Sequence, residues 1–283
     1  MEEKMSRLEF SYHSPALGFR TTVTAIVPSI DWIEMVRGVK AEEYYGRRYP
    51  VLWLLHGTSG DNDCWMRFTR LESWAEQYKI AVIMPDCRLS AFCDMDKGPA
   101  FYTFVTDELP RVCRAIFPIL DQRENNFIGG LSMGGYGAMK IGLRNADKFS
   151  LILNLSGGVD RVAHVKNTIQ QNKITGLHNL SAMRATFGEL SMVKGSVNDV
   201  FALAESLAQS GLPKPKIFSS IGTKDPHWDE NIRLRALLIK NDYDVYWEQG
   251  PYIHDWTNWN HYIELGLQWA SRQWSGVAED IKW

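Results

Sequence analysis

A short glycine-rich motif near the middle of the chain contains a serine that could act as a nucleophile. Gly130, Ser132 and Gly134 form a G-x-S-x-G pattern that follows an apolar run at 127–128 and opens a helix-like stretch at 133–144. The pattern is informative in this context because the nucleophile must sit on a tight strand-to-helix turn with its hydroxyl exposed. The glycines leave room for the turn, and a helix N-terminus offers N–H groups to an oxyanion. The spacing fits neither a dinucleotide fingerprint nor a P-loop.

A serine hydroxyl is a weak nucleophile, so it needs a base within hydrogen-bond reach and an acid that orients the base. In a strand-turn-helix architecture these partners come later in the chain, the acid before the histidine. Asp225 lies just after an apolar run at 216–221, and His254 lies in the loop after the next run. We therefore predict a catalytic triad of Ser132, Asp225 and His254.

Other residues remain alternatives for the two partner roles. Asp255 and Asp229 are the reserve acids. His261 is expected on the following helix, where it would point into packing or solvent, and His227 is too close in sequence to the predicted acid to reach the serine. Three further histidines are interpreted as ordinary surface or core residues: His13, His164 and His178.

The oxyanion hole is expected to combine two backbone amides. One is the N–H of Met133, the residue after the nucleophile. The other is the N–H of Thr58, with Ser59 as second choice, in the H-G-T-S-G loop at 56–60 that follows an earlier strand-like run. We interpret His56 as a structural histidine that packs and hydrogen-bonds this loop.

The elements that must position these residues alternate along the chain. Short apolar runs typical of strands covered on both faces occur at 51–55, 80–84, 127–128, 151–155, 216–221 and 243–247. Stretches with helical periodicity lie between or after them at 61–78, 133–144, 197–209, 231–240 and 259–273. This alternation predicts a mostly parallel central sheet with helices on both faces.

Three segments depart from the simple alternation. The β-branched stretch at 17–27 predicts an early antiparallel strand or hairpin partner. The stretch at 100–117 reads as helical, but Pro110 removes a backbone hydrogen bond, so a kink or two pieces are expected. The polar, weakly periodic stretch at 159–188 predicts a small cap or insertion over the carboxyl edge of the sheet. We expect one domain over residues 1–283.

The composition excludes several other classes of protein. The chain has 283 residues, with 31 Lys+Arg against 33 Asp+Glu, a net charge of −2, so a nucleic-acid partner is not expected. No apolar run approaches the roughly 18 residues of a membrane span, and the N-terminus lacks an apolar leader core, so we expect a cytoplasmic protein without membrane contact. A secreted protein stripped of its leader would look the same. The cysteines show no CxxC pair and are expected to be reduced packing residues: Cys64, Cys87, Cys93 and Cys113.

Four motifs together give the chain a family resemblance. These are L-L-H-G at 54–57, G-L-S-M-G-G-Y-G-A at 130–138, G-T-K-D at 222–225 and H-D-W at 254–256. With them, nearly the whole chain resembles the putative-esterase family of α/β-hydrolases, most closely the intracellular tributyrin-esterase type. The resemblance implies an α/β-hydrolase fold and hydrolysis of short-chain acyl esters through an acyl-enzyme, without a cofactor or metal.

Substrate identity is left open by the sequence. Trp256 and Trp259 flank the histidine loop and could stack on an aryl or sugar group, and Ser59 could contact substrate, although core packing is the commoner role of tryptophan. Alternatives are an acetyl xylan or feruloyl esterase acting on acylated carbohydrate, an S-formylglutathione hydrolase-like thioesterase, or an acyltransferase that uses the same triad. In the corresponding loop, esterase D proteins have a sequence similar to S-G-L-T-C. Residues 56–60 of this chain contain no cysteine. Homo-oligomer formation is also left open.

Overall fold

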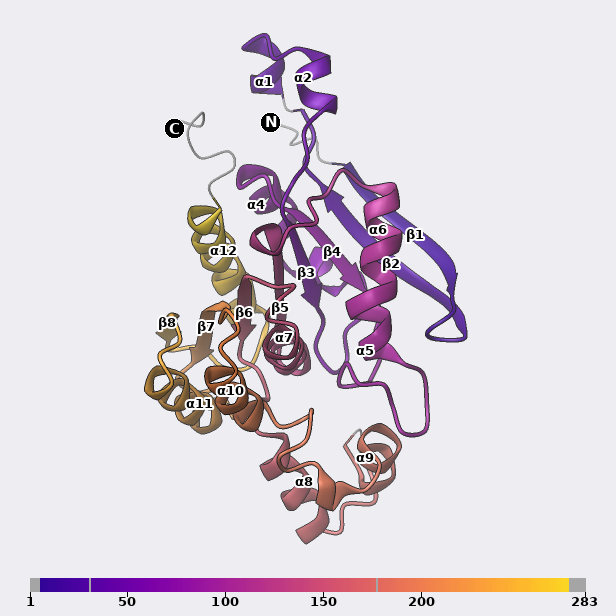
Figure 1. Cartoon of the computed structure of the whole chain (residues 1–283), viewed down its shortest axis with the longest axis vertical. Coiled ribbons are helices and arrows are strands. Elements are labelled where there is room, and N and C mark those ends of the chain that lie inside the picture. Colours follow the sequence, from indigo (N-terminus) through magenta and orange to yellow (C-terminus); the bar gives the residue numbers. More distant parts are fainter. Residues whose placement is uncertain (1–5, 31, 177, 275–283) are drawn as a thin grey trace.

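An eight-stranded sheet forms the centre of the computed structural model, which describes residues 6–30, 32–176 and 178–274. The strand order is β1-β2-β4-β3-β5-β6-β7-β8 (Figure 1). The pairs β1/β2 and β2/β4 are antiparallel, and all other neighbouring strands are parallel. The bounds are β1 Ser6–Ser14, β2 Phe19–Val27, β3 Val51–Leu55, β4 Ala81–Pro85, β5 Asn126–Leu131, β6 Leu151–Leu155, β7 Lys216–Gly222 and β8 Val245–Gly250. The predicted mostly parallel sheet is confirmed.

Helices cover both faces of the sheet, which explains why the central strands are apolar at every position. In β3, Val51, Trp53 and Leu55 face one hydrophobic core, and Leu52 and Leu54 face the other. The first core also contains side chains of α6 (Leu109–Ile116), α7 (Met133–Arg144), α10 (Val200–Gln209) and α11 (Trp228–Lys240). The second contains side chains of α3 (Cys64–Phe68), α4 (Leu71–Gln77) and α12 (Trp256–Gln273).

The N-terminal half differs from the sequence prediction in two places. The strand expected at 17–27 begins at Phe19 and is the second strand of a hairpin, because residues 15–18 form the turn after β1. The single helix expected at 61–78 is divided into α3 and α4. Thr69 divides it: its backbone is extended, its hydroxyl donates to the Trp65 carbonyl, and the same oxygen accepts the N–H of Leu71. A side-chain hydroxyl here competes with the helical hydrogen bonds.

The segment at 100–117 is helical in several pieces, as Pro110 leads one to expect. A short helix α5 (Phe101–Thr103) runs into a π-turn (Phe104–Glu108) and then into α6, whose first turn contains Pro110. A proline is tolerated in the first turn, where its missing N–H costs nothing. Two later helices begin three residues earlier than predicted, α11 at Trp228 and α12 at Trp256.

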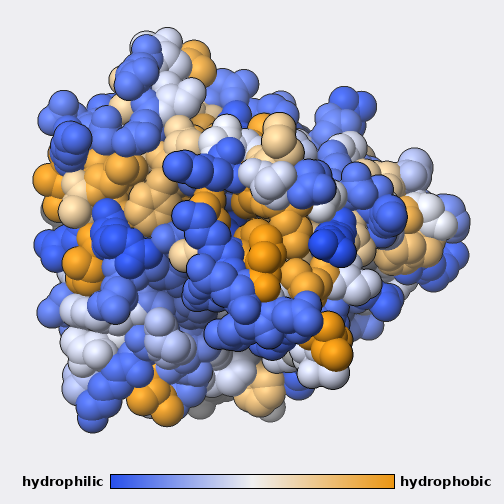
Figure 2. Space-filling model, turned by 90° about the horizontal axis from the view of Figure 1, so that it is seen from below, coloured by the Kyte–Doolittle hydropathy of each residue, from blue (hydrophilic) through white to orange (hydrophobic). Residues whose placement is uncertain are grey.

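The stretch at 159–188 contains two helices, α8 (Arg161–Gln170) and α9 (Leu180–Phe187), followed by a 3₁₀ turn at Leu190–Met192. Asp160 and Asn179 cap the two helices with their side chains. The segment has a small apolar core of its own, formed by Val165, Met183, Leu190 and Val193. The helices lie at the bottom of Figure 1, and the face seen from below mixes hydrophobic and hydrophilic residues (Figure 2). We propose that this segment acts as a cap; residue 177 lies outside the described part.

Two short helices, α1 (Trp32–Val36) and α2 (Ala41–Tyr45), complete the described chain. All four cysteines are buried and unpaired. Within the described ranges, no helix has both the length and the apolar character that crossing a bilayer requires. Residues 1–5, part of the N-terminus on which the leader expectation rests, are not described.

Candidate active site

Ser132 lies on the tight turn between β5 and α7, in a backbone conformation that few residues adopt. Its φ is 54° and its ψ is −115°, outside the regions common for residues with a side chain. The flanking glycines are required by close backbone contacts: a Cβ on Gly130 would lie 2.6 Å from the Gly134 carbonyl oxygen, and one on Gly134 would lie 2.7 Å from that of His56. The turn therefore accounts for both glycines of the motif.

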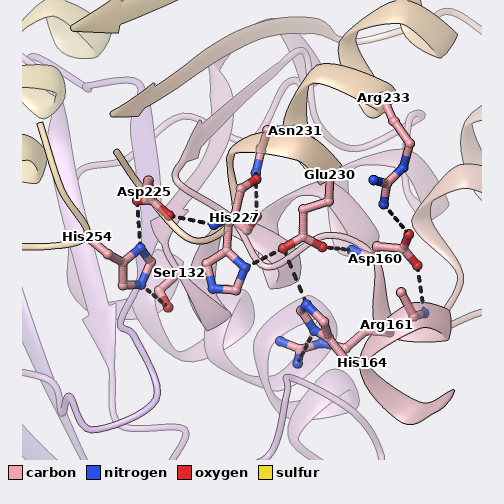
Figure 3. A network of polar contacts seen from close by, with 12 residues as sticks. Ser132, Asp160, Arg161, His164, Asp225, His227, Glu230, Asn231, Arg233 and His254 are labelled. Atoms are coloured by element: carbon pink, nitrogen blue, oxygen red, sulfur yellow. Dashed lines mark hydrogen bonds and ion pairs between the residues drawn. The ribbon is translucent and has the colours of Figure 1, made fainter. Parts of the chain in front are cut away.

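The three predicted triad side chains meet in one hydrogen-bonded line. The Nε2 of His254 lies 2.9 Å from the Ser132 Oγ, and its Nδ1 lies 2.8 Å from the Asp225 Oδ2. Asp225 follows β7 and its side chain is fully buried, whereas His254 follows β8 and is partly exposed (Figure 3). The other carboxylate oxygen, Oδ1, accepts the backbone N–H of His227 at 2.8 Å. Both oxygens of Asp225 are thus hydrogen-bonded.

The alternative acids and histidines lie elsewhere. Asp255 caps α12 by accepting the N–H of Asn258 at 3.2 Å, and Asp229 lies exposed in the first turn of α11. His261 lies on α12, as expected, with its ring beside Tyr252 and Tyr262. His227 lies closer to the site than the sequence suggested, since its ring is 5.0 Å from that of His254. Its Nδ1, however, is directed at Glu230.

The loop predicted to supply an oxyanion donor packs directly against the nucleophile. A Cβ on Gly57 would lie 2.6 Å from a Leu131 methyl carbon and 3.6 Å from the Ser132 Cβ. Thr58 follows Gly57 in this loop, and Met133 is the first residue of α7. The loop after β3 and the start of α7 therefore meet at Ser132, and oxyanion binding by the Thr58 and Met133 amides stays a prediction.

His56 is buried at the base of this loop with both ring nitrogens occupied. Its Nε2 accepts the backbone N–H of Cys87 at 2.9 Å, so Nδ1 carries the proton and donates to the Gly57 carbonyl at 2.7 Å. Burial lowers the pKa of His56, which agrees with a neutral ring. This geometry fits the structural role predicted for His56.

A family model described as "Putative esterase" matches residues 42–267, most of the chain. The chain belongs to this esterase family. An acetyl esterase of Caldicellulosiruptor saccharolyticus is 32% identical to it over 269 residues, which cover 95% of this esterase and 99% of the relative.

Solved structures agree with this assignment. Fluorophosphonate-binding serine hydrolase F of Staphylococcus aureus superposes with a TM-score of 0.81 at 30% identity, over 95% of this chain and 99% of that one. S-formylglutathione hydrolase of the same organism gives 0.79 at 29% identity, over 95% and 100%. A ferulic acid esterase at 18% identity shares the fold, with a TM-score of 0.76 over 96% of this chain and 99% of that one. The α/β-hydrolase fold is confirmed, and the protein is a carboxylic ester hydrolase of the serine hydrolase type.

The two tryptophans that flank the histidine loop of the esterase pack around it. Trp259 is 7% exposed and meets the His254 ring edge-on at 4.9 Å. Trp256 lies between Trp259 and the stacked ring of Phe68. Trp259 thus supports the imidazole from behind, and stacking of either tryptophan on a substrate stays a prediction. Ser59 is exposed in the loop after Gly57, and its contact with substrate is likewise untested.

A second polar cluster next to the triad was missed by the sequence analysis. The Oε1 of Glu230 is hydrogen-bonded to the Nδ1 of His227 and lies 3.3 Å from the Nε2 of His164, while Oε2 accepts the N–H of Asp160 at 2.6 Å (Figure 3). One ligand atom from each of His164, His227 and Glu230 lies within 4.8 Å of the others, close enough for a shared metal ion. No local pattern predicts this cluster, because its residues are up to 66 positions apart.

Glu230 is expected to stabilise the fold in a pH-dependent way. Burial raises the pKa of its carboxyl, but hydrogen bonds from His164 and His227 outweigh burial and hold it at about 2. A carboxyl with a depressed pKa stabilises the folded state above its ordinary pKa, near 4.5, and loses that contribution as the pH falls towards 2. We expect Glu230→Gln to reduce the free energy of unfolding at pH 6 by about 3 kcal/mol, and by progressively less between pH 5 and pH 2.

Urea denaturation of wild type and variant across this pH range measures the difference. Asp229→Asn, on the exposed side of the same helix, is the control and should show no such trend. An equal effect of Glu230→Gln at pH 3 and pH 6 would contradict the assignment.

Proposed function

We propose that the esterase hydrolyses short-chain acyl esters, with acetyl esters foremost, through an acyl-enzyme on Ser132. The observation that carries this proposal is the continuous line of hydrogen bonds from Asp225 through His254 to Ser132. The full-length similarity to an acetyl esterase supports the choice of acyl group.

In the proposed mechanism, His254 removes the proton of Ser132 as its Oγ attacks the ester carbonyl. The Met133 and Thr58 amides hold the oxyanion. His254 then protonates the departing alcohol and activates water for deacylation, while Asp225 keeps the imidazole in the required tautomer. No cofactor or metal takes part in these steps.

An S-formylglutathione hydrolase activity is the second candidate, because the S-formylglutathione hydrolase of Staphylococcus aureus is 29% identical over nearly the whole chain. The loop at 56–60 lacks the cysteine that esterase D proteins carry there. Feruloyl esterase activity rests on fold alone, and an acyltransferase would use the same residues.

A screen of acyl length against leaving group tests the proposal. We expect kcat/KM to be highest for p-nitrophenyl acetate and to fall as the acyl chain is lengthened through butyrate to octanoate. S-formylglutathione and methyl ferulate are assayed in parallel. Faster turnover of S-formylglutathione would favour the second candidate, and transfer of the acetyl group to an added alcohol in preference to water would favour an acyltransferase.

A further inference from the structure

Arg161, the first residue of α8, carries a buried guanidinium that lacks an acidic partner among the described residues. The residue is 7% exposed, and its Nε has no hydrogen-bond partner. One terminal nitrogen lies 3.4 Å from the Nδ1 of His164, and the guanidinium lies over the Tyr136 ring, 4.4 Å from its centroid. Burying a charge without a partner costs free energy. The structure therefore leaves this guanidinium in need of a counter-ion.

The three carboxylates of the polar network in Figure 3 are already engaged by other residues. Asp225 is hydrogen-bonded to His254, and Glu230 is held by two imidazoles and a backbone amide. Asp160, directly before Arg161, forms an ion pair at 2.7 Å with Arg233 (Figure 3). None of these acids pairs with Arg161, so an anionic ligand would supply the counter-charge that the described residues lack.

The guanidinium lines a pocket that also touches the predicted oxyanion donor. Besides Met133, its lining includes Leu89 and Ala91, and Met183 and Phe187 of α9. The pocket has a volume of about 20 Å³, room for one or two water-sized groups, which matches the two oxygens of a carboxylate but not a larger part of a substrate.

The charge of this pocket comes from the arginine. His178 is the other basic residue in its lining, and burial, followed by the nearby charges of Arg161 and His164, lowers the pKa of His178 to about 4. His178 is therefore neutral at pH 7, and Arg161 is the charged residue among those that line the pocket.

We propose that Arg161 binds a carboxylate of the substrate, so that the preferred esters of this enzyme carry a carboxylate on their acyl or alcohol portion. The planar guanidinium donates two parallel hydrogen bonds to a carboxylate, a geometry that a neutral group does not match. The inference rests on the proposed function, because it assigns the pocket beside Met133 to the substrate. Arg161 then determines specificity and takes no part in the bond-breaking steps.

Two matched pairs of esters test the proposal. On the alcohol side, 4-acetoxybenzoate is compared with 4-acetoxybenzamide; on the acyl side, monomethyl succinate is compared with methyl 4-oxopentanoate. The carboxylate member of at least one pair should have the higher kcat/KM. In Arg161→Met this preference should fall by about 10- to 100-fold, mainly through KM, with the neutral esters little affected. Arg161→Lys, which keeps the charge without the fork, should retain part of it.

Arg233→Met is the matched control, because Arg233 belongs to the same network but already has Asp160 as its partner. This variant should keep the carboxylate preference. A preference in one pair alone identifies the portion of the ester that carries the carboxylate. Equal kcat/KM values within both pairs, with the neutral esters hydrolysed, would overturn the inference and leave the proposed function intact.

Binding to the Ser132→Ala protein separates the two proposals, since that variant retains Arg161. Calorimetric titration should show tighter binding of 4-acetoxybenzoate or monomethyl succinate than of its neutral partner, and Arg161→Met in the same background should abolish the difference. If wild type hydrolyses neither p-nitrophenyl acetate nor any of the four esters, the proposed function fails, and this titration alone then decides the inference. Equal affinities within both pairs would overturn it.

Discussion

Replacing Ser132 with alanine is expected to lower kcat for p-nitrophenyl acetate by up to about 10⁶-fold, the scale of a triad knockout. The physical reason is that no other hydroxyl occupies the position 2.9 Å from the His254 Nε2, where a proton can be transferred as the carbonyl is attacked. The alanine should fold normally, because the conformation at this turn is imposed by the close contacts of Gly130 and Gly134. Steady-state kinetics and thermal unfolding measure the two effects.

Ser271→Ala is the control for this prediction. Ser271 lies on α12, and its hydroxyl donates only to the carbonyl of Gln268 in its own helix, so kcat should not change. Labelling with a fluorophosphonate gives a second readout: wild type and Ser271→Ala should be labelled, and Ser132→Ala should not. Turnover by Ser132→Ala at the wild-type level would reject the nucleophile assignment.

Asp225→Asn is expected to reduce kcat by about 10⁴-fold without a large change in KM. The amide oxygen of the asparagine should face the fixed backbone N–H of His227, which now donates to Oδ1 at 2.8 Å. The NH₂ group is then placed against the His254 Nδ1 in the position of Oδ2. Because a donor cannot face Nδ1–H, the imidazole is expected to carry its proton on Nε2, where it cannot accept one from Ser132.

Asp229→Asn is the matched control, since Asp229 is an exposed residue near Asp225 and was a reserve acid in the sequence analysis. It should retain wild-type kcat. A loss in Asp229→Asn with normal activity in Asp225→Asn would transfer the role of the acid to the other residue. Substrate titrations of all three proteins at one pH give kcat and KM separately.

Much of the fold was predictable because its pattern is local. The strands of the parallel region are apolar at successive positions, since helices cover both faces. The predicted first residue of five of them lies within one residue of the observed one. The predictions were least accurate where one side chain changes the backbone. Thr69 divides the helix expected at 61–78, and the first strand of the hairpin, β1, has mostly exposed residues and was missed.

The candidate triad could be predicted for a similar reason. Ser132 lies in a motif whose glycines are required by a crowded turn, and Asp225 and His254 each follow a recognisable strand. Carboxyl ends of neighbouring parallel strands meet at one edge of a sheet, so their order along the chain was enough to bring these residues together in the prediction.

The sequence by itself determined the alternation of strands and helices, the crowded serine turn and the choice of the three residues that meet there, because each depends on short stretches of chain. Only the tertiary structure decided how α8 and α9 lie against that site. It also decided that Glu230 is shared by two histidines and that Arg161 is left without an acid. These relations depend on how helices that are distant in sequence pack together. Such packing determines which charges are paired, and it produces no regular spacing of residues that the sequence could reveal.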